Sequence, residues 1–182
     1  MWEIILGIVG ALIVISFIYY YNRLVSLSNQ IDNSLSQIDV QLKKRSDLVP
    51  NLLESVKGYM KHEKGVIAEV TNARKALLGA TSFEGKVKAG NQLEGALKSI
   101  FAIAENYPQL RASENFMQLQ QELTAIEDKV AYARQFYNDG ILSYNNTCTT
   151  FPGKVFASIY NRHEKPFLKI TAEEKLVPKV SF

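Results

Sequence analysis

The sequence predicts an all-α fold, with a single N-terminal transmembrane helix followed by an antiparallel up-and-down four-helix bundle of long helices. Three observations lead to this prediction. The first two are an uncharged apolar run from Ile4 to Tyr21, and apolar residues that recur at intervals of three and four along most of the remaining chain. A third is that the sequence has no convincing pair of strands and no Asn-Gly hairpin. We expect an anchor at residues 1–22, the bundle at residues 23–151, and a short helix with an irregular tail at residues 152–182.

The composition limits the class of protein. The 182 residues include 21 Lys and Arg against 18 Asp and Glu, and the resulting net charge of +3 is too small to indicate a nucleic-acid-binding face. Hydrophobic residues make up 47% of the chain, which excludes a disordered protein. The single cysteine, Cys148, excludes a disulfide scaffold and is compatible with a reducing compartment. We expect no nucleic-acid partner.

The apolar run has the length of a membrane span. Eighteen residues of helix rise about 27 Å, close to the roughly 30 Å hydrocarbon thickness of a bilayer. Trp2 precedes the run and three tyrosines, Tyr19–Tyr21, end it, at positions where aromatic rings prefer the interface. A cleaved signal peptide would need basic residues before the run and small residues after it, and neither is present. We interpret residues 4–21 as an uncleaved anchor in the lipid bilayer, in which Gly7 and Ala11 form a weak helix-pairing motif.

Basic residues lie on the C-terminal side of the anchor. Arg23 follows it directly, and the cluster Lys43-Lys44-Arg45 comes about 20 residues later, whereas the N-terminal flank has no basic side chain. The positive-inside tendency therefore predicts an external N-terminus and a cytoplasmic bundle. The basic cluster could bind lipid head groups, but Asp39 and Asp47 dilute its charge, and we expect a solvated helix face.

The first apolar stripe of the bundle starts at Leu24 and keeps its phase past Pro50. A proline inside a helix breaks an internal hydrogen bond, so Pro50 either kinks one long helix or separates two helices, and the pattern allows both. Gly79 to Ser82 then form a break, and a shorter helix follows that Pro108 ends. The first stripe is Leu24, Leu27, Ile31, Leu35, Ile38, Leu42, Val49, Leu52, Val56, Tyr59, Val66, Val70 and Leu77, and the second is Leu93, Leu97, Ile100, Ala104 and Tyr107.

The last long helix has the clearest pattern. Ser113 is expected to cap its N-terminus, and a helix that extends to Asn146 would be about 51 Å long. Pro152-Gly153 would end it, followed by a short helix over Lys154–Tyr160 and an extended or irregular segment over Lys165–Phe182. The coiled-coil-like seam of the long helix is Phe116, Leu119, Leu123, Ile126, Val130, Ala133, Tyr137 and Tyr144.

The sequence predicts no catalytic, cofactor-binding or metal-binding residue. Two His-Glu pairs begin at His62 and His163, and neither continues into the His-Glu-x-x-His motif of a zinc protease, so we expect two solvated pairs. The Gly-Lys pairs at Gly85 and Gly153 lack the Ser or Thr of a phosphate-binding loop. Cys148 has no activating neighbour in the sequence, so we expect a structural or idle thiol. The chain is therefore expected not to be an enzyme and to need no cofactor.

Four tyrosines are followed by an asparagine. The pairs that begin at Tyr137 and Tyr144 are one heptad apart and share a helix face. They form either a polar recognition strip or a set of hydrogen-bonded groups that fixes the helix register. We favour the second interpretation because these two tyrosines continue the apolar seam. The other two pairs begin at Tyr21 and Tyr160.

These motifs resemble those of the LemA family, over the anchor and most of the bundle. Leu35 is a small departure, because some family members carry an aromatic residue there, and it affects packing only. The segments that carry the resemblance are residues 37–45 (QIDVQLKKR), 47–52 (DLVPNL), 56–59 (VKGY) with His62-Glu63, 105–112 (ENYPQLRA) and 133–138 (ARQFYN).

The resemblance implies a bacterial inner-membrane protein with one N-terminal span and an antiparallel four-helix bundle. It brings no catalytic residue, because the family has no established activity. Related genes sometimes lie beside membrane metalloproteases or other envelope proteins, which implies partnership. The resemblance leaves Glu105, Arg45 and Arg134 open between interface residues and residues that fix the bundle.

We therefore expect a non-catalytic membrane-anchored helical scaffold or adaptor. It would engage other membrane proteins, a membrane protease among the candidates, and form a homo-oligomer. The alternative is an envelope sensor, or a bundle that binds a ligand or lipid between its helices.

Overall fold

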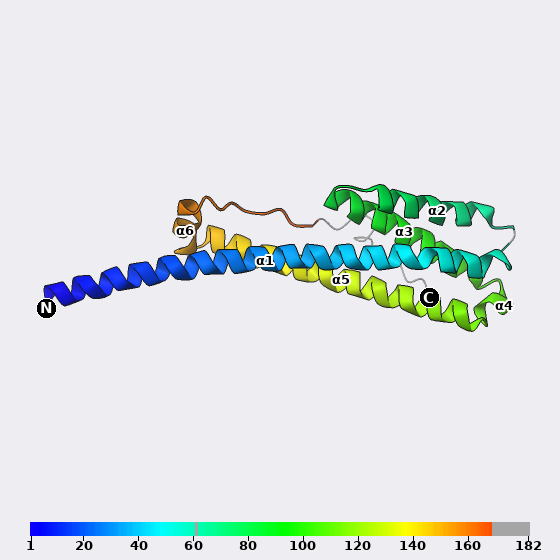
Figure 1. Cartoon of the computed structure of the whole chain (residues 1–182), viewed down its shortest axis with the longest axis horizontal. Coiled ribbons are helices and arrows are strands. Elements are labelled where there is room, and N and C mark those ends of the chain that lie inside the picture. The colour runs from blue at the N-terminus through cyan, green and yellow to red at the C-terminus, as the bar shows by residue number, and fades with distance from the viewer. Residues whose placement is uncertain (61, 169–182) are drawn as a thin grey trace, which may run out of the picture. The chain divides into compact units, whose positions relative to one another are not determined.

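The computed structural model describes residues 1–60 and 62–168, and within this part the chain is α-helical with no strand (Figure 1). This confirms the predicted all-α class. The helices of the described residues are α1 (Trp2–Lys57), α2 (Lys64–Gly79), α3 (Phe83–Ala104), α4 (Pro108–Arg111), α5 (Glu114–Thr149) and α6 (Gly153–Ile159).

The chain divides into two compact units. The first unit contains Met1–Leu35 and the residues from Arg134 onward, and the second unit contains Ser36–Ala133. Both α1 and α5 contribute residues to each unit, because each helix passes through a unit boundary.

Helix α1 is a single helix of 56 residues that continues through Pro50. At 1.5 Å per residue it is about 84 Å long. Of the two alternatives that the sequence left open, one long helix is therefore the observed one. The break that separates α1 from α2 lies after Lys57, where Gly58 ends the helical pattern, and Tyr59 is exposed although the stripe predicted it to be buried.

The N-terminal part of α1 is apolar and uncovered. An 18-residue stretch of this helix has a mean hydropathy of 2.3, and none of it is buried in the protein. Among the described residues, α1 is the one helix that is long and apolar enough to cross a membrane.

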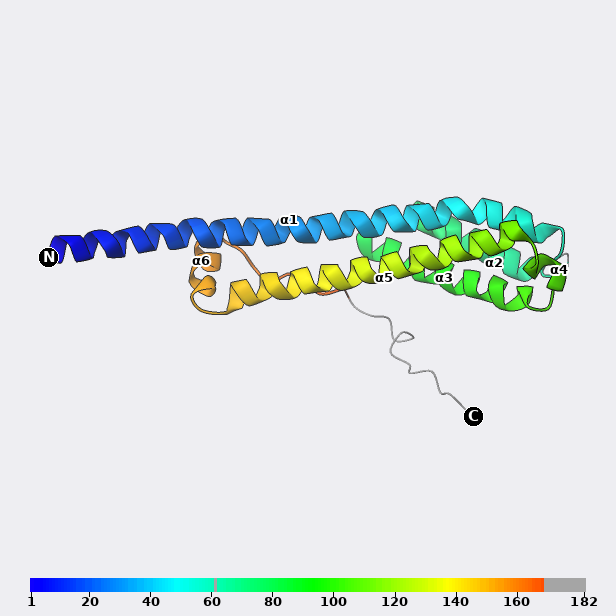
Figure 2. The same cartoon turned by 90° about the horizontal axis from the view of Figure 1, so that it is seen from below.

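In the first unit, α1 and α5 pack antiparallel. A Cβ atom at Gly140 would lie 3.2 Å from Cγ1 of Ile31, and one at Gly153 would lie 3.3 Å from Cε1 of Tyr20. As the chain advances from Gly140 to Gly153, its contact on α1 shifts toward the N-terminus, from Ile31 to Tyr20, as antiparallel packing requires. Helix α6 folds back against the N-terminal part of α1 (Figures 1 and 2). The buried apolar residues of this unit are Leu24, Leu27, Ile31, Tyr137, Ile141, Tyr144, Cys148 and Ala157.

In the second unit, α2 and α3 lie side by side (Figure 1). Ser82 caps α3 as its side-chain oxygen accepts a hydrogen bond from the Gly85 amide at 3.1 Å. The rings of Phe101 on α3 and Phe116 on α5 pack edge to face, with centroids 6.0 Å apart. The remaining stripe residues are largely buried, as the spacing predicts, and the fully covered ones include Ile38, Val49, Leu52, Val56, Val70, Leu93 and Ile100.

The short helices and helix ends differ from the sequence prediction by small amounts. Helix α3 ends at Ala104, and Pro108 does not end it but begins α4, a position where its missing N–H costs nothing. Helix α5 starts directly after Ser113 and reaches Thr149. Helix α6 begins at Gly153, one residue before its expected start. The predicted irregular segment is non-helical over residues 165–168, and its remainder lies outside the described residues.

Candidate functional site

Arg45 is inside the second unit. Its residue is only 1% exposed, so the expectation that the whole basic cluster is a solvated face is wrong at this position. Nη1 donates to the carbonyl oxygen of Gly90 at 3.3 Å and lies 3.5 Å from Oε2 of Glu94. Burial of a guanidinium requires such partners. The backbone of α3 can approach α1 here because residue 90 is glycine: a Cβ would lie 2.7 Å from Cδ2 of Leu42.

Glu94 joins Arg45 to a wider charged network. Lys98 Nζ lies 2.8 Å from Glu94 Oε1 and 3.0 Å from Oε1 of Glu127, so the network connects α1, α3 and α5. Burial alone would raise the pKa of Glu94, but hydrogen bonds from Lys98 and with Glu127, and the charges of Arg45 and Lys98, hold that pKa below its ordinary value. The hydrogen bond to Glu94 raises the pKa of Lys98 against the effect of burial.

These charges form one network across three helices. The Glu94 carboxylate is kept ionised, so it is unsuited to donate a proton near neutral pH. Alternating positive and negative groups from three helices instead fix which residues of those helices face each other.

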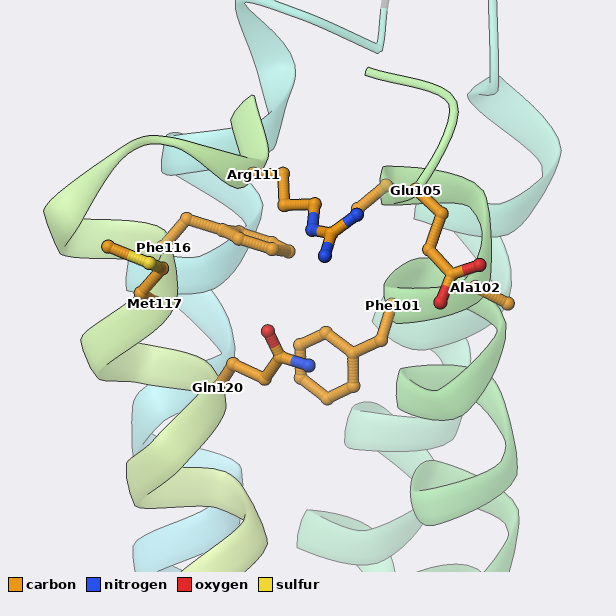
Figure 3. A pocket seen from close by; sticks show the side chains of 8 residues that line it. Phe101, Ala102, Glu105, Arg111, Phe116, Met117 and Gln120 are labelled. Carbon is orange, nitrogen blue, oxygen red and sulfur yellow. The ribbon is translucent and has the colours of Figure 1, made fainter. Parts of the chain in front are cut away.

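A hollow of about 470 Å³ lies at the end of α3, beside α4 and the start of α5. Figure 3 shows the Arg111 guanidinium reaching across it between the Phe116 ring and the Glu105 carboxylate. Gln120 and Phe101 complete its polar and aromatic lining (Figure 3). A cation, a carboxylate, an amide and two rings in one place are suited to hold a small polar molecule. Glu105 therefore lines a hollow, whereas Arg134 is half-buried on α5.

The asparagines of two Tyr-Asn pairs hold the C-terminal segment in the first unit. Asn145 Nδ2 donates to the Lys165 carbonyl oxygen at 2.9 Å, and the Lys165 amide donates to Asn145 Oδ1 at 2.8 Å. Asn138 forms the same pair of bonds with Leu168, at 3.5 and 3.0 Å. The two side chains are seven residues apart on α5. Each one donates to the carbonyl oxygen and accepts from the amide of the same residue, which holds the backbone at Lys165 and Leu168 against α5.

The tyrosines of the same pairs point the other way, into the core. Tyr137 and Tyr144 are buried, which confirms that they continue the seam. Lys165 covers this part of the core: its Nζ lies 5.1 Å from the centroid of the Tyr144 ring and 3.0 Å from Ser28 Oγ. Burial raises the pKa of the Tyr144 phenol and of the Cys148 thiol, so the cysteine has little of the thiolate that a nucleophile needs.

The other two pairs meet at the end of the apolar run. The rings of Tyr21 and Tyr160 are 5.3 Å apart, and the Tyr160 hydroxyl donates to the Phe17 carbonyl oxygen at 2.9 Å. The ring of Phe156, on α6, stacks on that of Tyr20 with centroids 4.7 Å apart. We refer to these five residues, Phe17, Tyr20, Tyr21, Phe156 and Tyr160, as the aromatic cluster. The sequence did not connect these positions, because they are about 140 residues apart.

The two histidines are exposed. His163 Nε2 lies 3.1 Å from Asn161 Oδ1. Within the part of the chain that the structure describes, no three His, Cys, Asp or Glu residues come together in a way that could hold a metal ion.

Comparison with known proteins gives the family. A protein named LemA from Metamycoplasma hominis is 28% identical over 134 residues, which cover 71% of this chain and 60% of that protein. The magnetosome protein MamQ of Magnetospirillum gryphiswaldense is 24% identical over 178 residues, 80% of this chain and 65% of the relative. The magnetosome protein MamQ 2 of Paramagnetospirillum magneticum is 23% identical over 184 residues, 85% and 68% of the two chains.

This chain thus spans less than two thirds of the length of the first two of these relatives. The sequence model of the LemA family matches residues 34–182, which is most of the chain. The protein belongs to the LemA family.

Proposed function

We propose that the protein is a non-catalytic, membrane-anchored helical scaffold or adaptor that engages other membrane proteins, a membrane protease among the candidates. The observation that carries this proposal is α1. It begins as an uncovered apolar helix of membrane-spanning length and continues without a break into residues that are buried in both compact units. A protein built in this way holds a folded domain next to a membrane.

We further propose that the domain is an antiparallel four-helix bundle. In the second unit, Arg45 with Glu94 joins α1 to α3, and Lys98 with Glu127 joins α3 to α5. Helices α2 and α3 run side by side with a short connection, which is typical of up-and-down bundles. The proposed division remains an anchor at residues 1–22, a bundle at 23–151 and a C-terminal part at 152–182.

The proposed location is the bacterial inner membrane, with the N-terminus outside and the bundle in the cytoplasm. Arg23, directly after the apolar run, and the absence of basic residues before that run support this orientation. Gly7 supports a homo-oligomer, because a Cβ added there would meet nothing within 4 Å and a small residue allows a second helix to approach closely.

The arrangement of the titratable groups supports a structural role rather than an enzyme. The Glu94 carboxylate is ion-paired, and the Cys148 thiol is buried and protonated. The names of the relatives, LemA and magnetosome protein, are not those of enzymes.

The test compares the full chain with a chain that lacks residues 1–16, both with a C-terminal tag. This truncation keeps Phe17, on which α6 packs. We expect the full chain to resist extraction of membranes at high pH and to form crosslinks to a defined set of membrane proteins. The shortened chain should remain helical, become soluble and lose those crosslinks. A soluble truncated chain that retains the same crosslinks, or a full chain that is extracted like a peripheral protein, would refute the proposal.

The hollow beside Arg111 supports a second candidate, a ligand-binding bundle that acts as an envelope sensor. A ligand that binds the folded state raises the melting temperature. If the hollow is a site, inorganic phosphate or a short-chain anionic lipid should raise the melting temperature of the full chain but not of the Arg111→Ala variant. Equal shifts in both chains, or none in either, would rule out this site.

A further inference from the structure

Helix α6 is attached to the last turn of the apolar run. The rings of Phe156 and Phe17 pack edge to face at 5.0 Å, and Phe156 also stacks on Tyr20 with an angle of 8° between the ring planes. The hydrogen bond from the Tyr160 hydroxyl to the Phe17 carbonyl oxygen fixes the other end of α6. These contacts set the position of α6 along α1, at residues 17 to 21.

The opposite side of α6 is apolar and uncovered. Phe151, just before the helix, is 86% exposed, and Val155 and Ile159 are 49% and 55% exposed. Val155 and Ile159 are four residues apart in α6, so they lie on the same helix face. Phe151 lies in the turn that precedes the helix. Two exposed aliphatic side chains thus share a face of α6, next to the aromatic cluster, and an exposed phenyl ring precedes the helix.

We propose that α6 lies in the membrane interface and that Phe151, Val155 and Ile159 contact the lipids of the bilayer that α1 spans. This inference rests on the proposed function, since it requires residues 4–21 to be in a membrane. If they are, Tyr19–Tyr21 lie at the interface, where aromatic residues concentrate. Helix α6 packs on that same turn and is therefore at the same depth. Its apolar face then meets acyl chains instead of water.

The charges around α6 fit this occupant. Lys154, in the first turn of α6, and Arg162, just after its end, are exposed. Basic side chains beside an apolar face are typical of helices that lie in the interface of a membrane with anionic lipids. The membrane would thus be contacted twice by one chain, through a span and through a short helix about 130 residues later.

The test uses tryptophan fluorescence in the full chain, reconstituted in vesicles of zwitterionic and anionic phospholipids. Trp2 is the single natural tryptophan and reports whether α1 is inserted. In a Trp2→Phe background, Ile159→Trp places a probe on α6, and Phe136→Trp places a matched probe on an exposed position of α5. Thermal melts confirm that each variant folds like the natural chain. Each chain is measured with lipids brominated near the head group and with lipids brominated near the chain end.

We expect Trp2 in the natural chain, and the probe of the I159W chain, to be quenched severalfold more than the probe of the F136W chain. The I159W probe should also be quenched more by bromines near the head group than by bromines near the chain end. If Trp2 is quenched and the I159W probe is not, α6 is not in the interface, while the anchor stands. If Trp2 is not quenched either, the proposed membrane anchor itself fails. A blue-shifted but unquenched I159W probe would mean that protein, such as a second copy, covers α6, which also overturns the inference.

Discussion

Arg74 donates a hydrogen bond from Nε to the carbonyl oxygen of Ser46 at 2.9 Å. Ser46 is buried, and its carbonyl is the one that the amide of residue 50 would bond in a regular α-helix. Residue 50 is proline and has no amide hydrogen. A side chain from α2 thus supplies the donor that the proline in α1 lacks, and this compensates for the proline inside a long helix.

Replacement of Arg74 by Met should therefore destabilise the protein by about 1–3 kcal/mol, the cost of an unsatisfied buried polar group. In a Pro50→Ala background the new amide can bond Ser46 itself, and the same replacement should cost about 1 kcal/mol less. Urea unfolding of the four chains in detergent micelles gives this coupling energy. Lys75→Met, an exposed neighbour, is the matched control. Equal costs of Arg74→Met in both backgrounds would show that Pro50 and Arg74 are independent.

Asn145→Ala should loosen the C-terminal segment. The variant loses two hydrogen bonds to the Lys165 backbone. If their loss lowers the free energy of opening this segment by about 1.4 kcal/mol, the Lys165 amide exchanges its hydrogen about tenfold faster. Hydrogen exchange measured by mass spectrometry should therefore show the Lys165 amide exchanging about tenfold faster. Asn146→Ala, at the exposed next position, should leave that rate unchanged. If both variants, or neither, accelerate the exchange, the asparagine does not hold the segment.

Arg45→Met should cost about 3 kcal/mol of folding free energy, at the lower end of values for broken buried ion pairs, because Glu94 keeps Lys98 as a partner. Arg45→Lys should recover only part of this loss, since one ammonium group cannot reproduce the planar fork that faces Gly90 and Glu94. Lys44→Met, on the exposed side of the helix, should change stability by about 0.5 kcal/mol at most. Denaturant midpoints of the three variants decide the matter, and similar losses for residues 44 and 45 would contradict the assigned role.

Glu94 should make the protein sensitive to acid. Its pKa is lower in the folded protein than in the unfolded chain, so the stability it contributes is present above the unfolded pKa and is lost as the pH falls through the folded pKa. Glu94→Gln should flatten the loss of stability between about pH 5 and pH 3, by at most one proton or about 1.4 kcal/mol per pH unit. Denaturant unfolding across this range, with Glu69→Gln as an exposed control, measures the difference. An unchanged slope in the Glu94 variant would argue against the ion pairs.

The parts of the fold that the sequence predicted are those with a local period. The apolar stripe of α1 and the seam of α5 follow from spacings of three and four, and burial of Leu24 or Tyr144 needs no knowledge of distant residues. The uncovered apolar stretch of α1 is equally local. Four-residue α4 was missed, since one helical turn has no periodicity to detect.

The errors arise where the deciding partner is far away in the chain. Arg45 was expected in solvent because its neighbours are charged, yet its partners are on α3, 45 and 49 positions later. Pro50 was left open because the donor that allows it to stay in the helix is Arg74 on α2. The Tyr-Asn pairs are visible in the sequence, but their asparagines at 138 and 145 bind a segment 20 to 30 residues downstream, and the sequence offers no signal for that pairing.

The uninterrupted course of α1 joins the proposed anchor to the folded residues through continuous helix, with no loop between them. Within the first unit, the residues of the proposed span and buried residues such as Leu24 and Ile31 belong to one helix, so their side-chain directions are fixed relative to one another. A single residue inserted between Tyr21 and Leu24 would turn the apolar stretch by about 100° against the packed stripe. The direction in which each face of the proposed span points is therefore fixed relative to the folded residues of the same helix. If the proposed span rotated or tilted in a membrane, the residues that pack on α5 would have to move with it, because no loop separates the two parts of α1.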